Sequence, residues 1–198
     1  KFGGLDLQIN LKVHNYDTNK LTSFLVNNLN WESNDIIINS SIKNKLLGKL
    51  KNINYEAKNI DIFKKETTNE LYGAIGLLSE INFQKENNNS IHALTPKLLL
   101  RFSPGSMRKE ENGSRLTVTN AFNLERLENN TNFETGNTAT MGFDYSIKNN
   151  DIEKFNFSVA QIINDKENKK LHDKSSLNEK LSDLVGESNF KLNENIKF

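Results

Sequence analysis

The sequence predicts an all-β fold: an antiparallel, curved, partial transmembrane β-barrel sheet of about eight or nine long strands. Three observations indicate this fold class. Residues 3–15 alternate apolar and polar side chains, and the same alternation recurs in several further segments. Short and long connections also alternate along the chain. A period of two is typical of a strand with one apolar face and one wet face.

The first predicted strand, residues 3–15, has the clearest alternation. Its apolar face carries Leu5, Leu7, Ile9, Leu11 and Val13. Its polar face carries Asp6, Gln8, Asn10, Lys12 and His14. A strand that crosses a bilayer at a tilt needs ~9–11 residues, whereas strands of soluble domains average ~5–6. The length and the wet face together favour the wall of an outer-membrane barrel.

The later strands repeat the pattern with different clarity. They are predicted, in chain order, at residues 21–31, 36–55, 71–83, 92–102, 139–147, 155–160 and 190–196. In the segment 139–147, for example, Met141 and Phe143 fall on the apolar face and Thr140 and Gly142 on the polar one. The last segment leaves room for the start of a ninth strand.

The connections between these segments carry a second signal. Short polar turns are predicted at residues 33–34, 85–90, 149–151 and 193–195, and long polar segments near 56–69, 104–136 and 165–183. The turn at residues 16–20 is a short exception. Outer-membrane barrels have short periplasmic turns and long extracellular loops, so this order favours a barrel over a β-sandwich.

Composition excludes several classes of protein. The net charge of +1 gives no indication of nucleic-acid binding. The absence of cysteine rules out a disulfide framework and thiolate metal sites. No run of 18 apolar residues occurs, which excludes a transmembrane helix. The mean hydropathy of −0.64 fits a barrel, because only alternate residues face lipid.

The residues do not predict an enzyme, a cofactor or a metal site. The three histidines, His14, His92 and His172, share no short spacing, and the chain has no H-E-x-x-H or G-x-S-x-G motif. We interpret these histidines as solvated or interfacial.

Five cations fall by parity on the polar face of the predicted wall. They are Lys43, Lys45, Lys97, Arg101 and Lys191. In a hydrated lumen they could form charge-assisted hydrogen bonds to phosphates. The alternative is that a wet lumen holds mixed charges for solubility and cross-strand pairing.

The longest connection, residues 104–136, turns apolar in its second half. Phe122, Leu124 and Leu127 lie close together there, which a loop surrounded by water would not need. We therefore predict that this half folds into the lumen as a plug through Asn120, Phe122 and Arg126, with Arg126 hydrogen-bonded to a wall residue. Residues 106–113 are expected to stay mobile.

The second half of the chain resembles the barrel domain of the LPS-assembly outer-membrane protein (LptD, or OstA) family. The likeness rests on a strand with a proline at 94–104, an Asn/Arg loop at 120–127, a T-x-G-x-x-Y strand at 134–145 and a strand at 155–162 of the F-x-x-S-V-G-Q kind. Residues 182–187 match the start of the next strand. Ala160 stands where the family usually has glycine.

The resemblance implies that residues 1–198 are a fragment of a single outer-membrane β-barrel domain, without its N-terminal periplasmic domain and remaining strands. It implies a place in the bacterial cell outer membrane and a part in inserting lipopolysaccharide into the outer leaflet. The implied partners are lipopolysaccharide, outer-membrane lipid, an LptE-like lipoprotein plug and a periplasmic lipopolysaccharide bridge, with no nucleic acid.

Two other interpretations stay open on the residues alone. One is a different outer-membrane barrel, such as a porin or a receptor. The other is a soluble antiparallel β-domain with a binding or adhesion role.

Overall fold

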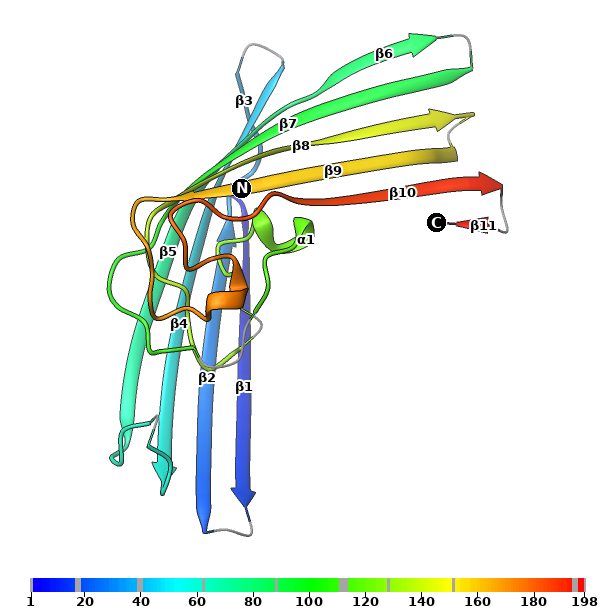
Figure 1. Ribbon diagram of the computed structural model, residues 1–198. Helices are drawn as coiled ribbons and strands as arrows, with labels where there is room; N and C mark the ends of the chain where they lie inside the picture. The colour runs from blue at the N-terminus through cyan, green and yellow to red at the C-terminus, as the bar shows by residue number, and fades with distance from the viewer. Residues whose placement is uncertain are drawn as a thin grey trace.

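The computed structural model describes residues 2–16, 19–38, 41–61, 63–87, 89–110, 114–127, 129–150, 152–193 and 196–197. They form one antiparallel sheet with the ladder order β1-β2-β4-β5-β7-β8-β9-β10-β11 (Figure 1). The long strands are β1 (Gly4–Tyr16), β2 (Lys20–Glu32), β4 (Ile42–Lys58), β5 (Thr68–Ile81), β7 (Ser90–Phe102), β8 (Thr138–Asn149), β9 (Ile152–Asn164) and β10 (Val185–Asn193). β11 (Ile196–Lys197) is short.

Two short strands extend the path of a longer neighbour. β3 (Ile36–Ile38) follows β2 and pairs with the start of β4, while β6 (Phe83–Asn87) follows β5 and pairs with the start of β7. The described ladder therefore has nine positions, and the predicted fold class of about eight or nine strands is confirmed.

The break between β2 and β3 corrects the predicted turn at residues 33–34. The amide of Ser33 donates to Leu46 O over 2.8 Å, and the Leu46 amide donates to Ser33 Oγ over 2.9 Å. These bonds keep the chain beside β4, so it does not reverse there. The single strand predicted at 36–55 is instead β3 and β4, and the reversal lies between Ile38 and Ile42, where residues 39–40 are outside the described part.

The sheet is open and strongly curved. β1 to β5 and β7 to β10 point in clearly different directions, and the segments that follow β7 and β9 lie on the concave side (Figure 1). β1 and β11 lie at the two ends of the described ladder and do not pair with each other. No helix among the described residues, including α1 (Val118–Ala121), is long and apolar enough to span a membrane.

The convex face is apolar and unburied. Leu7 is 61% exposed, Ile75 63% and Met141 50%. The register places the residues of this face side by side across the strands, as in the row Leu29–Leu50 and the row Leu77–Leu100. Toward the short turns an aromatic group covers the same face, formed by Phe143, Tyr145, Phe155, Phe157 and Phe190. An exposed apolar face excludes the compact two-sheet sandwich of a soluble domain.

The concave face carries the core. One buried cluster joins Phe24, Val26, Ile53 and Tyr55 of the wall to Leu124 and Phe133 of the connection after β7. A second joins Ala160 and Ile162 of β9 to Met107, Leu116, Leu171 and Leu177. Because the sheet is a single layer, these long connections supply the second layer that a buried core needs.

The two faces predict opposite responses to charge on strand β8. Met141→Arg places a guanidinium on the convex apolar face and should cost ~2–4 kcal/mol of unfolding free energy in a bilayer. Ser146→Arg places it on the concave face and should cost less than about 1 kcal/mol. Denaturant unfolding of the full-length protein in lipid vesicles measures both, and the reverse ranking would contradict the face assignment.

Gly142 is unsuitable as the tolerant control expected from its polar-face position. A Cβ built there would lie 2.1 Å from Val159 O and 3.1 Å from Phe122 Cζ. Substitution at Gly142 therefore displaces backbone or the loop ring, so a position on the polar face is not by itself a tolerant one.

Candidate functional site

The connection 104–136 lies folded against the concave face of the wall. Leu124 and Phe133 insert between wall side chains, and Phe133 stacks on Tyr72 with a centroid separation of 5.9 Å. Gly76 permits this approach, since a Cβ at that position would meet Leu124 Cδ2 at 2.7 Å. We call residues 104–136 the inner loop.

Arg101 of β7 holds the inner loop through three carbonyl groups. Its Nε donates to Leu124 O over 2.7 Å, its Nη1 donates to Gly136 O over 3.0 Å, and its Nη2 donates to Glu134 O. The side chain is 3% exposed. Arg101 thus faces inward, as parity predicts, but its donors are occupied by the loop.

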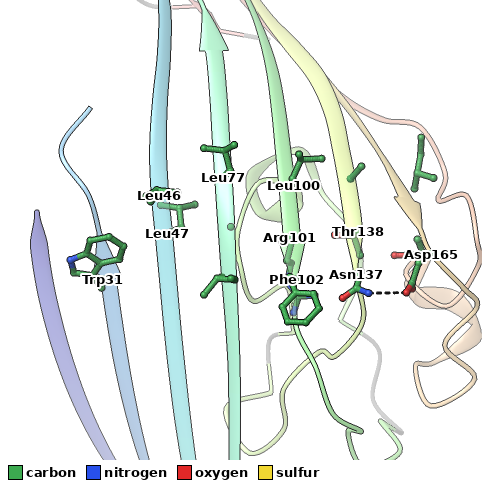
Figure 2. Close-up of a pocket in the computed structure, with 15 residues that line it drawn as sticks. Trp31, Leu46, Leu47, Leu77, Leu100, Arg101, Phe102, Asn137, Thr138 and Asp165 are labelled. Carbon is green, nitrogen blue, oxygen red and sulfur yellow. Dashed lines mark hydrogen bonds between the residues drawn. The ribbon is translucent and has the colours of Figure 1, made fainter. Parts of the chain in front are cut away.

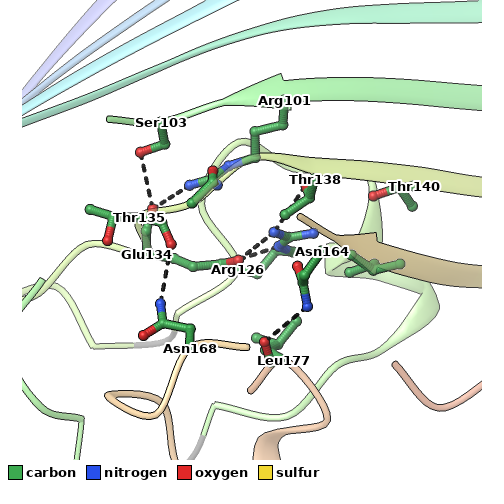
Figure 3. A network of polar contacts seen from close by, with 12 residues as sticks. Arg101, Ser103, Arg126, Glu134, Thr135, Thr138, Thr140, Asn164, Asn168 and Leu177 are labelled. Atoms are coloured by element: carbon green, nitrogen blue, oxygen red, sulfur yellow. Dashed lines mark hydrogen bonds and ion pairs between the residues drawn. The ribbon is translucent and has the colours of Figure 1, made fainter. Parts of the chain in front are cut away.

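Arg126 and Glu134 form the buried centre of the loop (Figure 3). Arg126 Nε donates to Glu134 Oε2 over 2.8 Å, Nη2 donates to Oε1, and Nη2 also lies 3.4 Å from Thr138 Oγ1 at the start of β8. The two residues are 1% and 2% exposed. A bidentate pair of this kind is strong and directional. Because it is buried, removal of one partner would leave the other charge buried and uncompensated, which destabilises the fold.

The charge of Glu134 is stabilised in place. Burial opposes its ionisation, but the guanidinium groups of Arg126 and Arg101 outweigh burial and hold the pKa of this carboxyl below its usual range. Arg126 Nη1 is also buried and has no hydrogen-bond partner among the described residues. The pair is therefore tied mainly by one edge of the guanidinium.

A second clamp joins the inner loop to strand β4. Lys49 Nζ lies 2.8 Å from Glu125 Oε2, Lys51 pairs with Glu125 Oε1, and Lys51 Nζ also donates to Asn132 O over 3.1 Å. Lys51 is fully buried. These residues were not predicted from the sequence, although Lys49 and Lys51 lie on the inward parity of β4 between the apolar residues Leu47 and Ile53.

A third clamp lies near the β4–β5 connection. Arg108 Nε donates to Glu70 Oε2 over 2.9 Å and its Nη2 donates to Thr131 O. Its guanidinium also stacks 5.0 Å from the ring centroids of Tyr55 and Phe63. No periodic signal marks Arg108, because it belongs to an irregular segment.

The connection 165–183, which contains the 3-10 turn η1 (Asp173–Ser175), covers the inner loop from the other side. The Glu110 amide donates to Lys170 O over 2.7 Å, and the Leu116 amide donates to Ser175 O over 3.0 Å. Met107 is 2% exposed and Glu110 4% exposed, so these two residues of the segment expected to be mobile are buried. Residues 111–113 lie outside the described part.

The remaining two residues of the predicted plug have different environments. Phe122 lies beside Gly142 and 5.8 Å from Lys97 Nζ, so its ring faces the wall. Asn120 instead caps α1 in a reciprocal pair with Thr117 and donates to Arg115 O over 2.9 Å. Asn120 therefore shapes the loop itself and has no bond to the wall among those described.

The other inward cations lie toward the short-turn end of the wall. Lys43 pairs with Asp35 at 2.9 Å, and Lys45 lies 3.6 Å from Glu32. Lys97 contacts Asp144 at 2.6 Å and Glu80 at 3.5 Å. Lys191 lines a hollow between β9 and β10 with Glu187 and Lys154 among its neighbours. Of these four, Lys97 lies beneath Phe122 of the inner loop, and Lys191 shares its hollow with Val118 and Thr119 of that loop.

Comparison with known proteins identifies the family. The model of the family LptD, LPS transport system D, matches residues 46–198, which is more than three quarters of the chain. The chain belongs to the LptD family. No curated protein matches it.

The LptD match extends further than the motifs of the sequence. Those motifs lie in residues 94–187, whereas the family match begins in strand β4 at residue 46 and thus includes Lys49, Lys51 and Glu70. LptD proteins are outer-membrane proteins of lipopolysaccharide transport, and the all-β sheet agrees with a barrel of that family.

Breaking the buried pair tests the clamp. Glu134→Gln removes the charge that balances two buried guanidinium groups, and loss of one partner of a buried pair costs about 3–5 kcal/mol. We expect faster hydrogen exchange at inner-loop amides, measured by mass spectrometry. Glu187→Gln, on an exposed site of β10, is the matched control and should leave exchange unchanged.

The lowered pKa of Glu134 predicts how the loop responds to acid. A free carboxyl titrates near ~4.3, so the stabilisation is complete above about that pH and is lost as the pH falls through the lower pKa of the docked state. Hydrogen exchange at inner-loop amides, corrected for the intrinsic effect of pH on exchange, should stay slow at about pH 4 and become faster only in stronger acid. Loss of protection that begins near pH 6 would contradict this.

Proposed function

We propose that this chain is part of the wall of the outer-membrane translocon that inserts lipopolysaccharide into the outer leaflet. In this proposal residues 1–198 form a fragment of one barrel domain in the bacterial cell outer membrane. The convex apolar face contacts lipid, and the concave polar face borders a hydrated lumen. Transport of this kind makes and breaks no bond.

One observation supports the proposal most: buried cations of the wall hold the inner loop against the concave face, and a buried ion pair orders the loop itself. Arg101, Lys51 and Arg126 are all at most 3% exposed and hold loop groups on the side of the long connections. Long connections are extracellular in barrels of this kind. A loop fixed there acts as a plug that closes the lumen toward the cell exterior.

The cations outside the loop provide a surface for the cargo. Lys43, Lys45, Lys97 and Lys191 lie toward the short-turn, periplasmic end, where lipopolysaccharide would arrive. Ammonium groups bind phosphates by charge-assisted hydrogen bonds. Three of them already have carboxylate neighbours, so phosphate would exchange with those neighbours. Arg101 is left out of this role because the loop carbonyls occupy it.

The proposal includes two protein partners. A lipoprotein plug of the LptE kind would occupy the part of the lumen that this wall borders, and a periplasmic bridge would deliver lipopolysaccharide through an N-terminal domain. Both would act on the full-length protein, and co-purification from outer membranes tests them.

Arg126→Ala tests the plug in cells. The change leaves Glu134 buried without its main partner, so the loop should detach while the strands still pair. We expect the outer membrane to become permeable to a large glycopeptide antibiotic, measured as a fall in its inhibitory concentration. The amount of assembled, heat-modifiable barrel should stay within about twofold of the wild type.

Arg115→Ala is the matched control, since Arg115 belongs to the same loop and is exposed. It should leave permeability at the wild-type level. Equal permeability in both variants, or normal permeability in Arg126→Ala with the loop shown to be detached, would contradict the plug.

A further inference from the structure

The convex face contains a hollow that the wall-and-plug description does not use. It has a volume of about 700 Å³ and lies over β4, β5, β7 and β8 (Figure 2). Its side chains are mostly apolar and face away from the lumen, among them Trp31, Leu46, Ile75, Leu100 and Phe102. Two small residues, Gly76 of β5 and Ala139 of β8, are among its lining.

A cationic cleft adjoins one end of this hollow. The cleft has a volume of about 770 Å³ and shares Phe102, Asn137, Asn164 and Asp165 with the hollow. The lysines that line it are Lys166, Lys169, Lys170 and Lys180. All four are exposed, and none forms an ion pair within the described part of the chain.

The acidic groups of the cleft are fewer than its lysines. Glu134 is bound by Arg126, and Asp165 accepts a hydrogen bond of 3.0 Å from Asn137 (Figure 2). Glu167 is the other acidic residue that lines it. Lys170 already donates to Ser106 Oγ, which orients its ammonium group across the cleft. The cleft therefore presents a surplus of positive charge beside an apolar surface.

We propose that this paired surface binds a lipid of the outer leaflet with a phosphorylated headgroup and several acyl chains. The acyl chains lie in the hollow, and the phosphates contact Lys166, Lys169 and Lys180. The cleft lies between the connections after β7 and after β9, on the side of the long loops, so the headgroup faces the cell exterior. This inference rests on the proposed place in the outer membrane.

The site is separate from the lumen. The hollow opens on the convex face, whereas Lys43, Lys45 and Lys97 face the concave side of the same sheet. A lipid bound here contacts the wall from outside, as a resident of the membrane and not as cargo in passage. A protein partner fits less well, because the hollow lies on the part of the convex face that a bilayer covers.

Native mass spectrometry of the full-length protein tests this binding. The probes are bisphosphorylated lipid A, the same lipid with its phosphates removed, and phosphatidylethanolamine. We expect the bisphosphorylated lipid to be retained preferentially. The double variant Lys166→Gln, Lys169→Gln should weaken its binding by roughly fivefold for each lysine.

Matched controls distinguish binding at this site from the general effects of removing positive charge or adding a large side chain. Lys64→Gln with Lys65→Gln removes two adjacent exposed lysines from another long connection and should leave binding unchanged. Ala139→Trp fills the hollow and should reduce retention of lipid A with and without phosphates. Met141→Trp, on the same face but outside the hollow, should not.

Equal retention of lipid A with and without phosphates, or equal losses in the two lysine pairs, would overturn the inference. Surface lipopolysaccharide in cells is measured in parallel. Normal delivery without lysine-dependent binding would contradict the lipid site alone. Lysine-dependent binding in a protein that delivers no lipopolysaccharide would contradict the proposed function alone.

Discussion

The structure depends on the fact that its sheet is a single layer with a different environment on each side. Backbone groups pair between strands, so every side chain must point either to the convex or to the concave face. On the convex face this requires apolar residues. On the concave face it creates a difficulty, because Phe24, Ile53 and Tyr72 also point there and have no second sheet to cover them. The inner loop supplies that cover.

An irregular loop makes a poor core layer unless its polar backbone is satisfied, and the wall provides the donors. Arg101 binds three loop carbonyls and Lys51 binds a fourth. Burial of each of these cations costs desolvation free energy, and its hydrogen bonds offset that cost only when all of its acceptors are in place. The arrangement therefore favours one docked conformation over partly docked ones. The Arg126–Glu134 pair has the same consequence within the loop.

Period-two alternation was enough to predict the strands and their faces, since Met141 lies outside and Thr140 inside as expected. The turn predicted at residues 33–34 was misplaced, because Ser33 bonds to Leu46 and keeps the chain extended until the reversal between Ile38 and Ile42. The site was predicted less completely. Arg126 was recognised from the apolar residues around it. Its partner Glu134 lies in an irregular segment, where the spacing of residues in the sequence does not predict the direction of their side chains. Arg101 has the parity of a lumen cation, and only the fold shows that loop carbonyls occupy it.

The two faces meet at the small residues of the wall. Gly76 and Gly142 let Leu124 and Phe122 approach the sheet from inside, where a Cβ would collide with the loop or a neighbouring strand. Gly76 also lines the hollow on the outside, together with Ala139 of β8. A larger residue at 76 would thus loosen the loop directly. Because the loop holds the ends of β7 and β8 through Arg101 and Thr138, such a change would also alter the shape of the convex face. The inner loop and the hollow therefore share Gly76 in a wall that is a single sheet thick.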